Sequence, residues 1–354
     1  MKKVISVLLV LVLALSLFAC AKSDNNETTT AADGSETTAA GETLKTDKDG
    51  LKEITVSLDY TPNTNHTGMY VADAKGYYKD AGLKVTIVQP PENGAELMCA
   101  AGQAQFAVSY QDTIAASFAS DTPIEVTAVA AILQHNTSGI ISRKGEGIDR
   151  PKGLEGKTYS TWDSPIEQAM LKYVMEKDGG DFSKVNLIPY NVEDDAAALM
   201  HKDTDAIWIY YGWAGVAAKL KGLDFDYFDF ISIDNVFDYY TPMIIANNDF
   251  LKNDPETAKA FLAATKKGYE FAIENPEESA QILIDGDTTG SLKGSEKLVT
   301  ESQKWISTQY KAEADEWGVF DANRWDNFYK WLSDNNLVEK RLEKGTGFTN
   351  DFIQ

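Results

Sequence analysis

A polar loop between a short apolar strand and a helix holds the residue types best suited to bind a small molecule. It runs from Leu58 to Gly68 with the sequence Leu-Asp-Tyr-Thr-Pro-Asn-Thr-Asn-His-Thr-Gly. A connection of this kind needs only Gly, Pro and one capping side chain, but most side chains of this one can form hydrogen bonds. Such a loop at the end of a strand is typical of the ligand crevice of an open α/β sheet, although a well-capped turn would share its composition. The candidate ligand contacts are Tyr60, Asn63, Asn65 and His66.

Further strand ends carry a similar mixture of aromatic side chains with amides and hydroxyls. Aromatic faces supply a large rigid contact area, while amides and hydroxyls fix the orientation of a ligand by hydrogen bonds. Neither Lys nor Arg occurs in these segments, so the mixture favours a neutral or weakly basic planar heterocycle over a phosphate or a sulfonate. The candidate contacts in these segments are Tyr110, Gln111, Asn136, Trp162, Ser164, Glu167, Tyr210 and Trp213.

Several of these aromatic and polar residues also have a purely structural interpretation. Tyr210 and Trp213 could pack between lobes, and Ser164 could simply cap a helix whose first residue is Pro165. Trp208 lies in the middle of an apolar strand, so we expect it in the core. We also expect packing roles for the tryptophans on or beside the C-terminal amphipathic helices, Trp305, Trp317, Trp325 and Trp331.

The pattern of histidines and glycines does not indicate catalysis. His66, His135 and His201 are far apart in the sequence, and none has the spacing of a metal-ligand pair. No Gly-x-Ser-x-Gly elbow, phosphate loop or dinucleotide-binding glycine motif occurs. We therefore expect a binding protein rather than an enzyme, with no metal site and no cofactor.

Alternating apolar strands and helices predict an α/β fold with mainly parallel, doubly wound sheets. A first series begins with the strand Ile54–Leu58, and the pattern restarts near Arg150-Pro151. Strands expected at Ile231–Ile233 and Met243–Ala246 return the chain to the first series, and helices follow from Pro255 onward.

This order predicts two lobes that close as a clamp. Lobe 1 would comprise residues 51–142 plus 240–354, including the helical C-terminal part, and lobe 2 would comprise residues 143–239. The two connections between the lobes are expected near Ser142–Gly147 and near Tyr239–Pro242.

The N-terminal residues predict export and attachment to a membrane. Lys2 and Lys3 precede an apolar run that is too short for an ordinary transmembrane helix, so residues 1–20 are interpreted as a signal peptide. The run ends Leu17-Phe-Ala-Cys20, which resembles the lipobox of bacterial lipoproteins and implies lipidation of Cys20; the alternative is a simple cleaved signal with an incidental cysteine. Residues 21–50 contain almost no large apolar side chain, which is typical of a disordered tether. The protein is therefore expected to lie outside the cytoplasm, anchored by lipid to a bacterial membrane.

Charge and cysteine content restrict the partners. Removal of Lys2 and Lys3 changes the formal net charge from −21 to −23, which excludes nucleic acid as an expected ligand because no basic stripe is present. Cys99 is then the only cysteine beyond Cys20, so no disulfide can form within the body, and we expect a buried thiol there. We expect the body to act as a monomer.

A set of motifs in fixed order resembles a known family. These are the Leu58–Gly68 loop, Gly76-Tyr-Tyr-Lys79, Gln105-Phe-Ala-Val-Ser-Tyr-Gln111, Gln134-His-Asn-Thr-Ser-Gly139 and Trp162-Asp-Ser-Pro165. They resemble the substrate-binding lipoproteins of ABC importers for thiamine pyrimidine precursors, a family similar to yeast hydroxymethylpyrimidine phosphate synthase and, more distantly, to alkanesulfonate and nitrate binding proteins. The resemblance covers roughly residues 51 to 250.

The resemblance implies a two-lobed clamp of the type II periplasmic-binding-protein kind. Such a clamp would capture an aminopyrimidine, such as formylaminopyrimidine or hydroxymethylpyrimidine, and deliver it to an ABC permease driven by a separate ATPase. The aromatic and amide contacts would map to Tyr60, Asn65, Tyr110, Trp162 and Tyr210.

Two departures from the family pattern leave alternatives open. The cysteine-rich motif of the synthase is absent, which counts against a pyrimidine-forming enzyme with His66 as its reacting residue. Ala214 stands where many pyrimidine binders have an acid, and Glu167 or Asp163 could substitute for it. The alternative cargoes for the same clamp are a flavin, another aromatic amine or a sulfonate.

Overall fold

The computed structural model describes residues 44–190, 192 and 194–353. The expected signal peptide 1–20, the expected lipidation site Cys20 and residues 21–43 of the expected tether lie outside the described residues. Residues 44–50, the end of that tether, form a turn in which Asp47 Oδ1 accepts hydrogen bonds from the N–H groups of Asp49 and Leu51, at 2.9 and 3.0 Å. Leu44 packs against the core, so these residues belong to the folded body.

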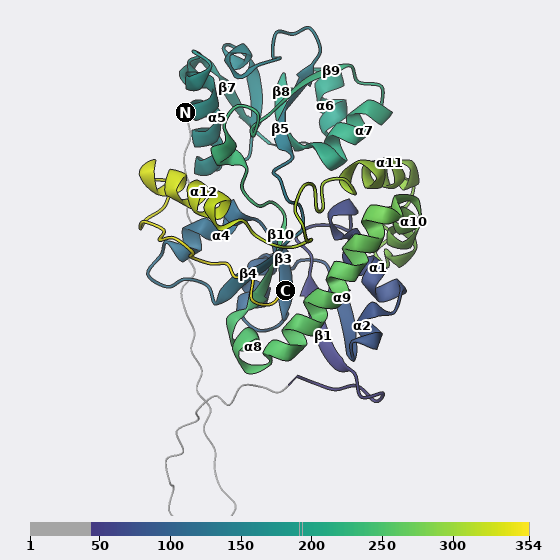
Figure 1. Ribbon diagram of the computed structural model, residues 1–354. Helices are drawn as coiled ribbons and strands as arrows, with labels where there is room; N and C mark the ends of the chain where they lie inside the picture. Colours follow the sequence, from purple (N-terminus) through teal and green to yellow (C-terminus); the bar gives the residue numbers. More distant parts are fainter. Residues whose placement is uncertain (1–43, 191, 193, 354) are drawn as a thin grey trace, which may run out of the picture. The chain divides into compact units, whose positions relative to one another are not determined.

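Sheet A has the strand order β2-β1-β3-β10-β4. β1 runs parallel to β2 and β3, whereas β10 runs antiparallel to β3 and β4. Helices α1 (Thr67–Ala74), α2 (Tyr77–Asp80) and α9 (Pro255–Glu274) pack on one face of this sheet (Figure 1). The strands are β1 (Lys52–Ser57), β2 (Leu83–Val88), β3 (Phe106–Ser109), β4 (Val126–Ala131) and β10 (Met243–Asn247).

Sheet B has the order β7-β6-β8-β5-β9. β6 runs parallel to β7 and β8, whereas β5 runs antiparallel to β8 and β9. Helix α5 (Pro165–Lys177) packs on one face, and α6 (Asp195–His201) and α7 (Val216–Leu220) pack on the other. The strands are β5 (Ser138–Arg143), β6 (Thr158–Thr161), β7 (Asn186–Pro189), β8 (Ala206–Tyr210) and β9 (Phe225–Asp229).

The predicted α/β architecture with mainly parallel sheets is confirmed, because four of the five strands in each sheet run in the same direction. One strand in each sheet, β10 in sheet A and β5 in sheet B, runs antiparallel to its two neighbours, so both sheets are mixed. The sequence prediction missed β9, an edge strand, because Asp is depleted in strands and this one reads Phe-Asp-Tyr-Phe-Asp. The expected strand Ile231–Ile233 is wrong: this segment is a turn, held by a hydrogen bond from the Ser232 N–H to Asp229 Oδ1 at 2.7 Å.

Two segments connect the sheets, and we refer to them as the crossings. The first, residues 132–137, joins β4 to β5, and the second, residues 230–242, joins β9 to β10. The first crossing comes before the expected Ser142–Gly147 because β5 already pairs with β8. The second contains the expected Tyr239–Pro242. The lobe boundaries at 142/143 and 239/240 stay a prediction.

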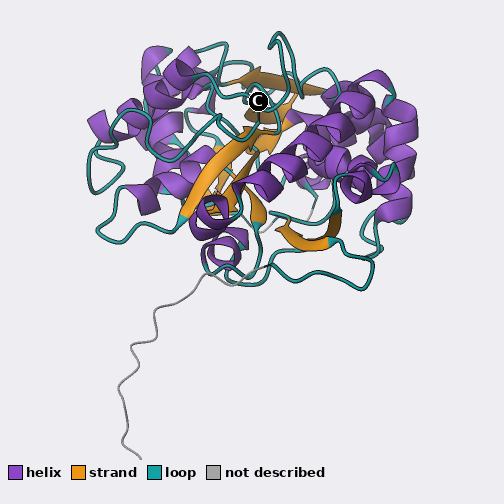
Figure 2. Ribbon diagram, turned by 60° about the horizontal axis from the view of Figure 1, so that its bottom comes forward, coloured by secondary structure: helices purple, strands orange, loops and turns teal. Residues whose placement is uncertain are grey.

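Local sequence explains where the main helices start. Ser164 accepts a hydrogen bond from the Glu167 N–H and Pro165 is the first residue of α5, as predicted. Proline likewise opens α9 and α10. The strands lie between helices in the view of Figure 2. The remaining helices are α3 (Ala95–Ala100), α4 (Gln111–Phe118), α8 (Asn248–Asn253), α10 (Pro276–Gly286), α11 (Glu296–Ile306) and α12 (Ala322–Asp334).

One hydrophobic core extends from sheet A through the crossings to sheet B, and α12 closes it. Trp208 is only 4% exposed, and Trp317, Trp325 and Trp331 are also buried, so all four lie in the core as expected. Trp305 is partly buried and packs against the core. Cys99 is buried as expected. Within the described ranges, no helix has both the length and the apolar character needed to cross a bilayer.

Candidate functional site

The Leu58–Gly68 loop is built around a buried carboxylate at the end of β1. Asp59 Oδ1 lies 2.6 Å from His66 Nε2, and Asp59 Oδ2 accepts a hydrogen bond from the Tyr110 hydroxyl. Burial alone would favour the neutral acid. The pKa of Asp59 nevertheless lies below its ordinary value, because the His66 ring and the Tyr110 hydroxyl stabilise the negative charge. The loop therefore holds a buried anion at the end of β1.

The polar residues of this loop hold one another in place. The Asn63 side chain accepts a hydrogen bond from the Asn65 N–H at 2.9 Å, and His66 Nδ1 accepts one from the Asn63 N–H at 3.2 Å. Because Nδ1 accepts, Nε2 carries the proton that is donated to Asp59. A Cβ on Gly68 would lie 2.3 Å from the Tyr269 ring, so only glycine fits there.

Two tyrosines from different sheets face each other beside Asp59. Tyr110 follows β3 of sheet A, and Tyr210 ends β8 of sheet B. Their ring centroids are 6.3 Å apart and their planes differ by 15°. Burial is the main reason that the pKa of each hydroxyl is raised, so both stay protonated and polar. The two sheets thus present a pair of near-parallel aromatic faces.

A second carboxyl group next to these tyrosines has no partner for one of its oxygens. Asp112 lies in the first turn of α4, and its Oδ1 atom is buried without a hydrogen bond within the described part of the chain. Burial raises the pKa of Asp112 to about 6. Hydrogen bonds from the N–H groups of Asp112 and Thr113 lower the pKa, and repulsion from Glu96 raises it further. A buried acceptor without a hydrogen bond destabilises the protein by about 1–3 kcal/mol. A donor group on a ligand would supply the missing hydrogen bond.

A buried donor without a partner lies on the same side of β8. Trp208 and Tyr210 are two residues apart and share one face of the strand, and the Trp208 Nε1 atom has no acceptor among the described residues. We refer to Asp59, Tyr110, Asp112, Trp208 and Tyr210 as the strand-end cluster. It offers one unmet acceptor, one unmet donor and two aromatic faces.

Two exposed aromatic side chains follow the ends of β1 and β6. Tyr60 is 66% exposed and Trp162 is 43% exposed, which is unusual for side chains of this size. The Trp162 ring lies 5.8 Å from that of Tyr190 and also 5.8 Å from that of Trp208. Tyr190 in turn donates its hydroxyl to Asp195 at 2.8 Å. These exposed rings are free to cover a ligand.

Other residues predicted from the sequence have their polar atoms engaged inside the protein. Glu167 is buried, accepts hydrogen bonds from the Tyr159 and Thr161 hydroxyls at 2.6 and 2.8 Å, and holds the Trp162 N–H. Gln111 is buried and bonds to the backbone of Tyr240 and Trp325. These contacts give Glu167 and Gln111 positioning roles, and whether either touches a ligand stays a prediction.

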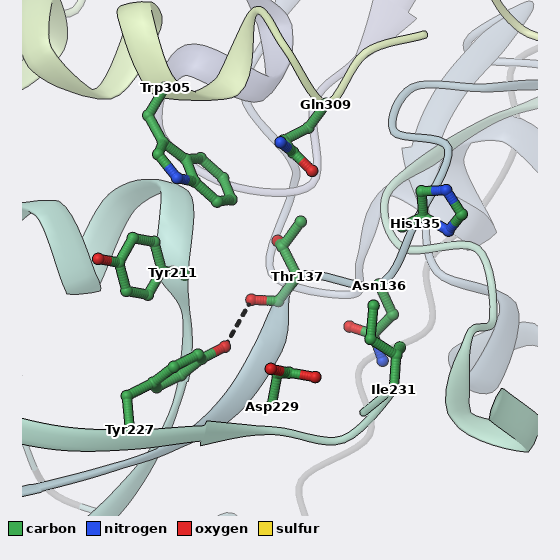
Figure 3. A pocket seen from close by; sticks show the side chains of 9 residues that line it. All are labelled: His135, Asn136, Thr137, Tyr211, Tyr227, Asp229, Ile231, Trp305 and Gln309. Carbon is green, nitrogen blue, oxygen red and sulfur yellow. Dashed lines mark hydrogen bonds between the residues drawn. The ribbon is translucent and has the colours of Figure 1, made fainter. Parts of the chain in front are cut away.

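The remaining predicted residues are divided between two hollows. Asn65 and Trp213 line a small cavity of about 20 Å³ together with Tyr210. Asn136 lies elsewhere, in a pocket of about 280 Å³ next to the first crossing (Figure 3), which we refer to as the crossing pocket. Its lining residues are His135, Asn136, Thr137, Tyr211, Tyr227, Asp229, Ile231, Trp305 and Gln309.

Sequence reasoning missed the two acids of the strand-end cluster. Asp59 lay inside the loop already singled out, so its position after an apolar strand was an available signal. Asp112 gave no such signal, because an acid in the first turn of a helix is ordinarily explained by the helix dipole. The expected substitutes for the acid missing at Ala214 have other surroundings: Glu167 is bonded as above, and Asp163 accepts a hydrogen bond from Gln168 at the surface.

Two mixed sheets joined by two crossings, with aromatic side chains at facing strand ends, define the fold of periplasmic solute-binding proteins. The structure is similar to the periplasmic aliphatic sulphonate binding protein SsuA from Escherichia coli, with a TM-score of 0.64. The match has 14% sequence identity and covers 85% of this chain and 98% of that one. At this identity the likeness establishes the fold alone.

The chain belongs to the NMT1/THI5 like family, whose model matches residues 63–279. It is 27% identical over 305 residues to the formylaminopyrimidine-binding protein of Halalkalibacterium halodurans, which covers 86% of this chain and 91% of that protein. It is 26% identical over 259 residues to a 4-amino-5-hydroxymethyl-2-methylpyrimidine phosphate synthase of Saccharomyces cerevisiae, covering 68% and 72%. The relatives thus include a binding protein and an enzyme, and the fold and relatives together support a solute-binding role.

Proposed function

We propose that the protein is the extracytoplasmic solute-binding component of an ABC importer and that its cargo is a thiamine pyrimidine precursor. Formylaminopyrimidine and hydroxymethylpyrimidine are the two candidates. The cargo would bind at the strand-end cluster, between groups that belong to sheet A and groups that belong to sheet B. Its capture would favour a closed arrangement of the two sheets, and this form would dock on the permease.

The observation that carries this proposal is the match between the strand-end cluster and an aminopyrimidine. Such a ligand is planar, donates from its amino group and accepts at its ring nitrogens. The unpartnered Asp112 oxygen can accept from the amino group, and a protonated Asp112 can also donate to the neighbouring ring nitrogen. The Trp208 indole N–H supplies a further donor. Each buried group would then gain the hydrogen bond that it lacks in the free protein.

The spacing of the tyrosine rings sets what must move. A planar ring stacked between two others needs about 7 Å between the outer rings, because aromatic carbons pack at roughly 3.5 Å. Tyr110 and Tyr210 are 6.3 Å apart. Since they come from different sheets, a small rotation at the crossings would open a slot for the ligand. The reverse rotation would close the two tyrosine rings on the bound ligand.

The environment of His66 favours binding over the enzymatic alternative. The side chain of His66 is fully buried, and both ring nitrogens are engaged, Nδ1 with the Asn63 N–H and Nε2 with Asp59. A residue that reacts with a substrate needs an accessible lone pair. His66 is better suited to hold the loop and its carboxylate in place.

Membrane attachment rests on Cys20, which lies outside the described residues. Lipidation there would keep the binding protein near its permease and raise the local concentration of loaded protein. The Cys20→Ser variant is expected to leave the membrane fraction when cells are fractionated, whereas an unchanged distribution would count against the anchor.

Calorimetric titration with the two pyrimidines tests the cargo. Asp112→Ala should weaken binding by about tenfold or more, because a hydrogen bond to an ionisable group contributes about 1.5–3 kcal/mol. Asp249→Ala is the matched control, since Asp249 occupies the same position in the first turn of α8 but is exposed. Equal loss in both variants, or no binding of either pyrimidine to the unchanged protein, would overturn the proposal. Riboflavin and an alkylsulfonate in the same titration test the alternative cargoes.

A further inference from the structure

The crossing pocket is separate from the strand-end cluster and has a different construction. The two share no residue, although Tyr210 and Tyr211 are neighbours in the sequence. Tyr210 faces Tyr110, whereas Tyr211 contacts Tyr227 and Trp305. With a volume of about 280 Å³, the pocket is just below the usual range for small-molecule sites, about 300–1,000 Å³.

Three aromatic rings form one side of the pocket. The Tyr211 centroid lies 5.1 Å from that of Tyr227 and 5.1 Å from that of Trp305, with planes inclined by 58° and 43°. Figure 3 shows these rings around one end of the hollow. Inclined rings enclose a rounded space rather than a slot. Their electron-rich faces attract cations, and Lys219 Nζ already lies 5.1 Å from the Tyr211 centroid without lining the pocket.

A carboxylate lines the pocket beside Tyr227, two residues further along β9 and on the same face of the strand. Asp229 ends β9, and its Oδ1 atom accepts hydrogen bonds from the Ser232 N–H at 2.7 Å and from the Ser232 hydroxyl. Within the described ranges, no Lys, Arg or His side chain pairs with this carboxylate, and Oδ2 accepts no hydrogen bond. The negative charge is therefore available to a ligand.

The charged groups at the other end of the pocket offset one another. His135 Nδ1 lies 2.8 Å from Asp238 and Nε2 lies 2.7 Å from Glu313, and the hydrogen bond with Asp238 raises the pKa of His135. Arg324 lies 3.3 Å from Asp238 and 3.6 Å from Glu313. Asp238 and Glu313 thus each contact both His135 and Arg324. Asp229 remains the one lining charge without a counterpart among the described residues.

We propose that the crossing pocket is a second ligand site, distinct from the strand-end cluster, and that it takes a small organic cation with an alkylated ammonium group. The ammonium head would lie against the faces of Tyr211, Tyr227 and Trp305, and its charge would face Asp229. Thr137 and Gln309, on the first crossing and after α11, would contact the rest of the ligand.

Choline is a suitable probe, and its neutral carbon analogue 3,3-dimethylbutan-1-ol has the same shape without the charge. Titration of the full-length protein should detect choline binding and an affinity for the neutral analogue about tenfold lower, as expected for a cation–π site with a carboxylate. Equal affinities for the two probes would overturn the proposal, as would the absence of choline binding.

Variants locate the site and separate it from the proposed pyrimidine function. Asp229→Asn should lower choline affinity by about tenfold, while Asp224→Asn, the same charge change at an exposed position before β9, should have no effect. Trp305→Phe should retain more affinity than Trp305→Leu, because only the former keeps an aromatic face. All four variants should bind pyrimidines unchanged. If Asp229→Asn and Asp224→Asn lose choline affinity equally, the cation binds elsewhere and the proposal fails.

Discussion

The strand-end cluster and the crossing pocket use the same residue types in different geometries. Each combines aromatic rings with an aspartate beside the connections between the sheets. In the cluster, the rings of Tyr110 and Tyr210 are near-parallel and the free oxygen of Asp112 is buried. In the pocket, the rings are inclined to one another and Asp229 faces an open hollow. Parallel faces suit a planar heterocycle, whereas inclined faces around an accessible charge suit a rounded cation.

The burial of Asp112 gives the largest expected effect, which is on how the free energy of unfolding depends on pH. The pKa of Asp112 is raised to about 6 in the folded state from an ordinary value of 3.8, so the folded protein binds more protons between these values and becomes less stable as pH rises through them. Asp112→Asn should remove this loss and gain roughly 1–3 kcal/mol over the unchanged protein from about pH 4 to about pH 7. Urea unfolding at both pH values measures it.

The control for this experiment is Asp249→Asn, because it makes the same chemical change at an exposed position in the first turn of a helix. Asp249→Asn should follow the pH dependence of the unchanged protein. A parallel pH dependence in Asp112→Asn as well would mean that Asp112 is not buried as described, and the contrast between the two sites would lose its electrostatic basis.

Removal of a ring from the cluster should be selective for the planar ligand. Tyr210→Ala is expected to weaken pyrimidine binding by roughly thirtyfold, about 2 kcal/mol, through lost stacking and lost apolar contact. Choline binding should be unchanged, and the two titrations on one preparation measure both. Tyr210→Phe serves as control, since it keeps the ring. Loss of both ligands in Tyr210→Ala would show that the two regions are not independent.

The proton on Asp112 should also make pyrimidine affinity depend on pH. The proposed complex contains one proton shared between the carboxyl group and the pyrimidine, whereas Asp112 loses its proton above about pH 6 in the free protein. Affinity should therefore fall by up to about tenfold between about pH 7 and about pH 8. Asp112→Asn, whose amide offers a donor and an acceptor at any pH, should show a flatter profile. Identical profiles would contradict a role for this proton.

The smallest expected effect concerns the exposed rings next to the cluster. Tyr60 is 66% exposed, so it can cover a bound ligand but has little packing of its own. Tyr60→Ala should weaken pyrimidine binding by about threefold, or roughly 0.7 kcal/mol, mainly through faster dissociation. Stopped-flow release of the ligand measures it, and an unchanged dissociation rate would assign Tyr60 no covering role.

Much of the fold and part of the cluster could be predicted from local pattern. The strand ends at Ser109 and Tyr210 were placed correctly because apolar runs stop there, and this directed attention to Tyr110 and Tyr210. Periodicity does not report strand direction, so the antiparallel β10 and β5 were missed. Asp112 was missed because only the tertiary structure buries its free oxygen.

The crossing pocket could not be predicted, because its walls come from distant segments. Thr137, Asp229 and Trp305 are brought together by the first crossing, by an edge strand with an unusual sequence and by α11. Of the candidate ligand contacts expected from the sequence, only Asn136 lies there, although His135 and Thr137 of the same Gln134–Gly139 motif also line the pocket. Its amide is engaged with the Phe237 carbonyl and the Ser138 N–H, so it shapes the pocket wall.

Native mass spectrometry of the protein purified from its own cells tests the central proposal most directly, followed by identification of the released ligand. The expected result is a noncovalent complex that releases an aminopyrimidine, with its occupancy reduced in Asp112→Ala and unchanged in Asp249→Ala. Release of a flavin or an alkylsulfonate, or a covalent adduct on His66, would contradict a pyrimidine-binding protein.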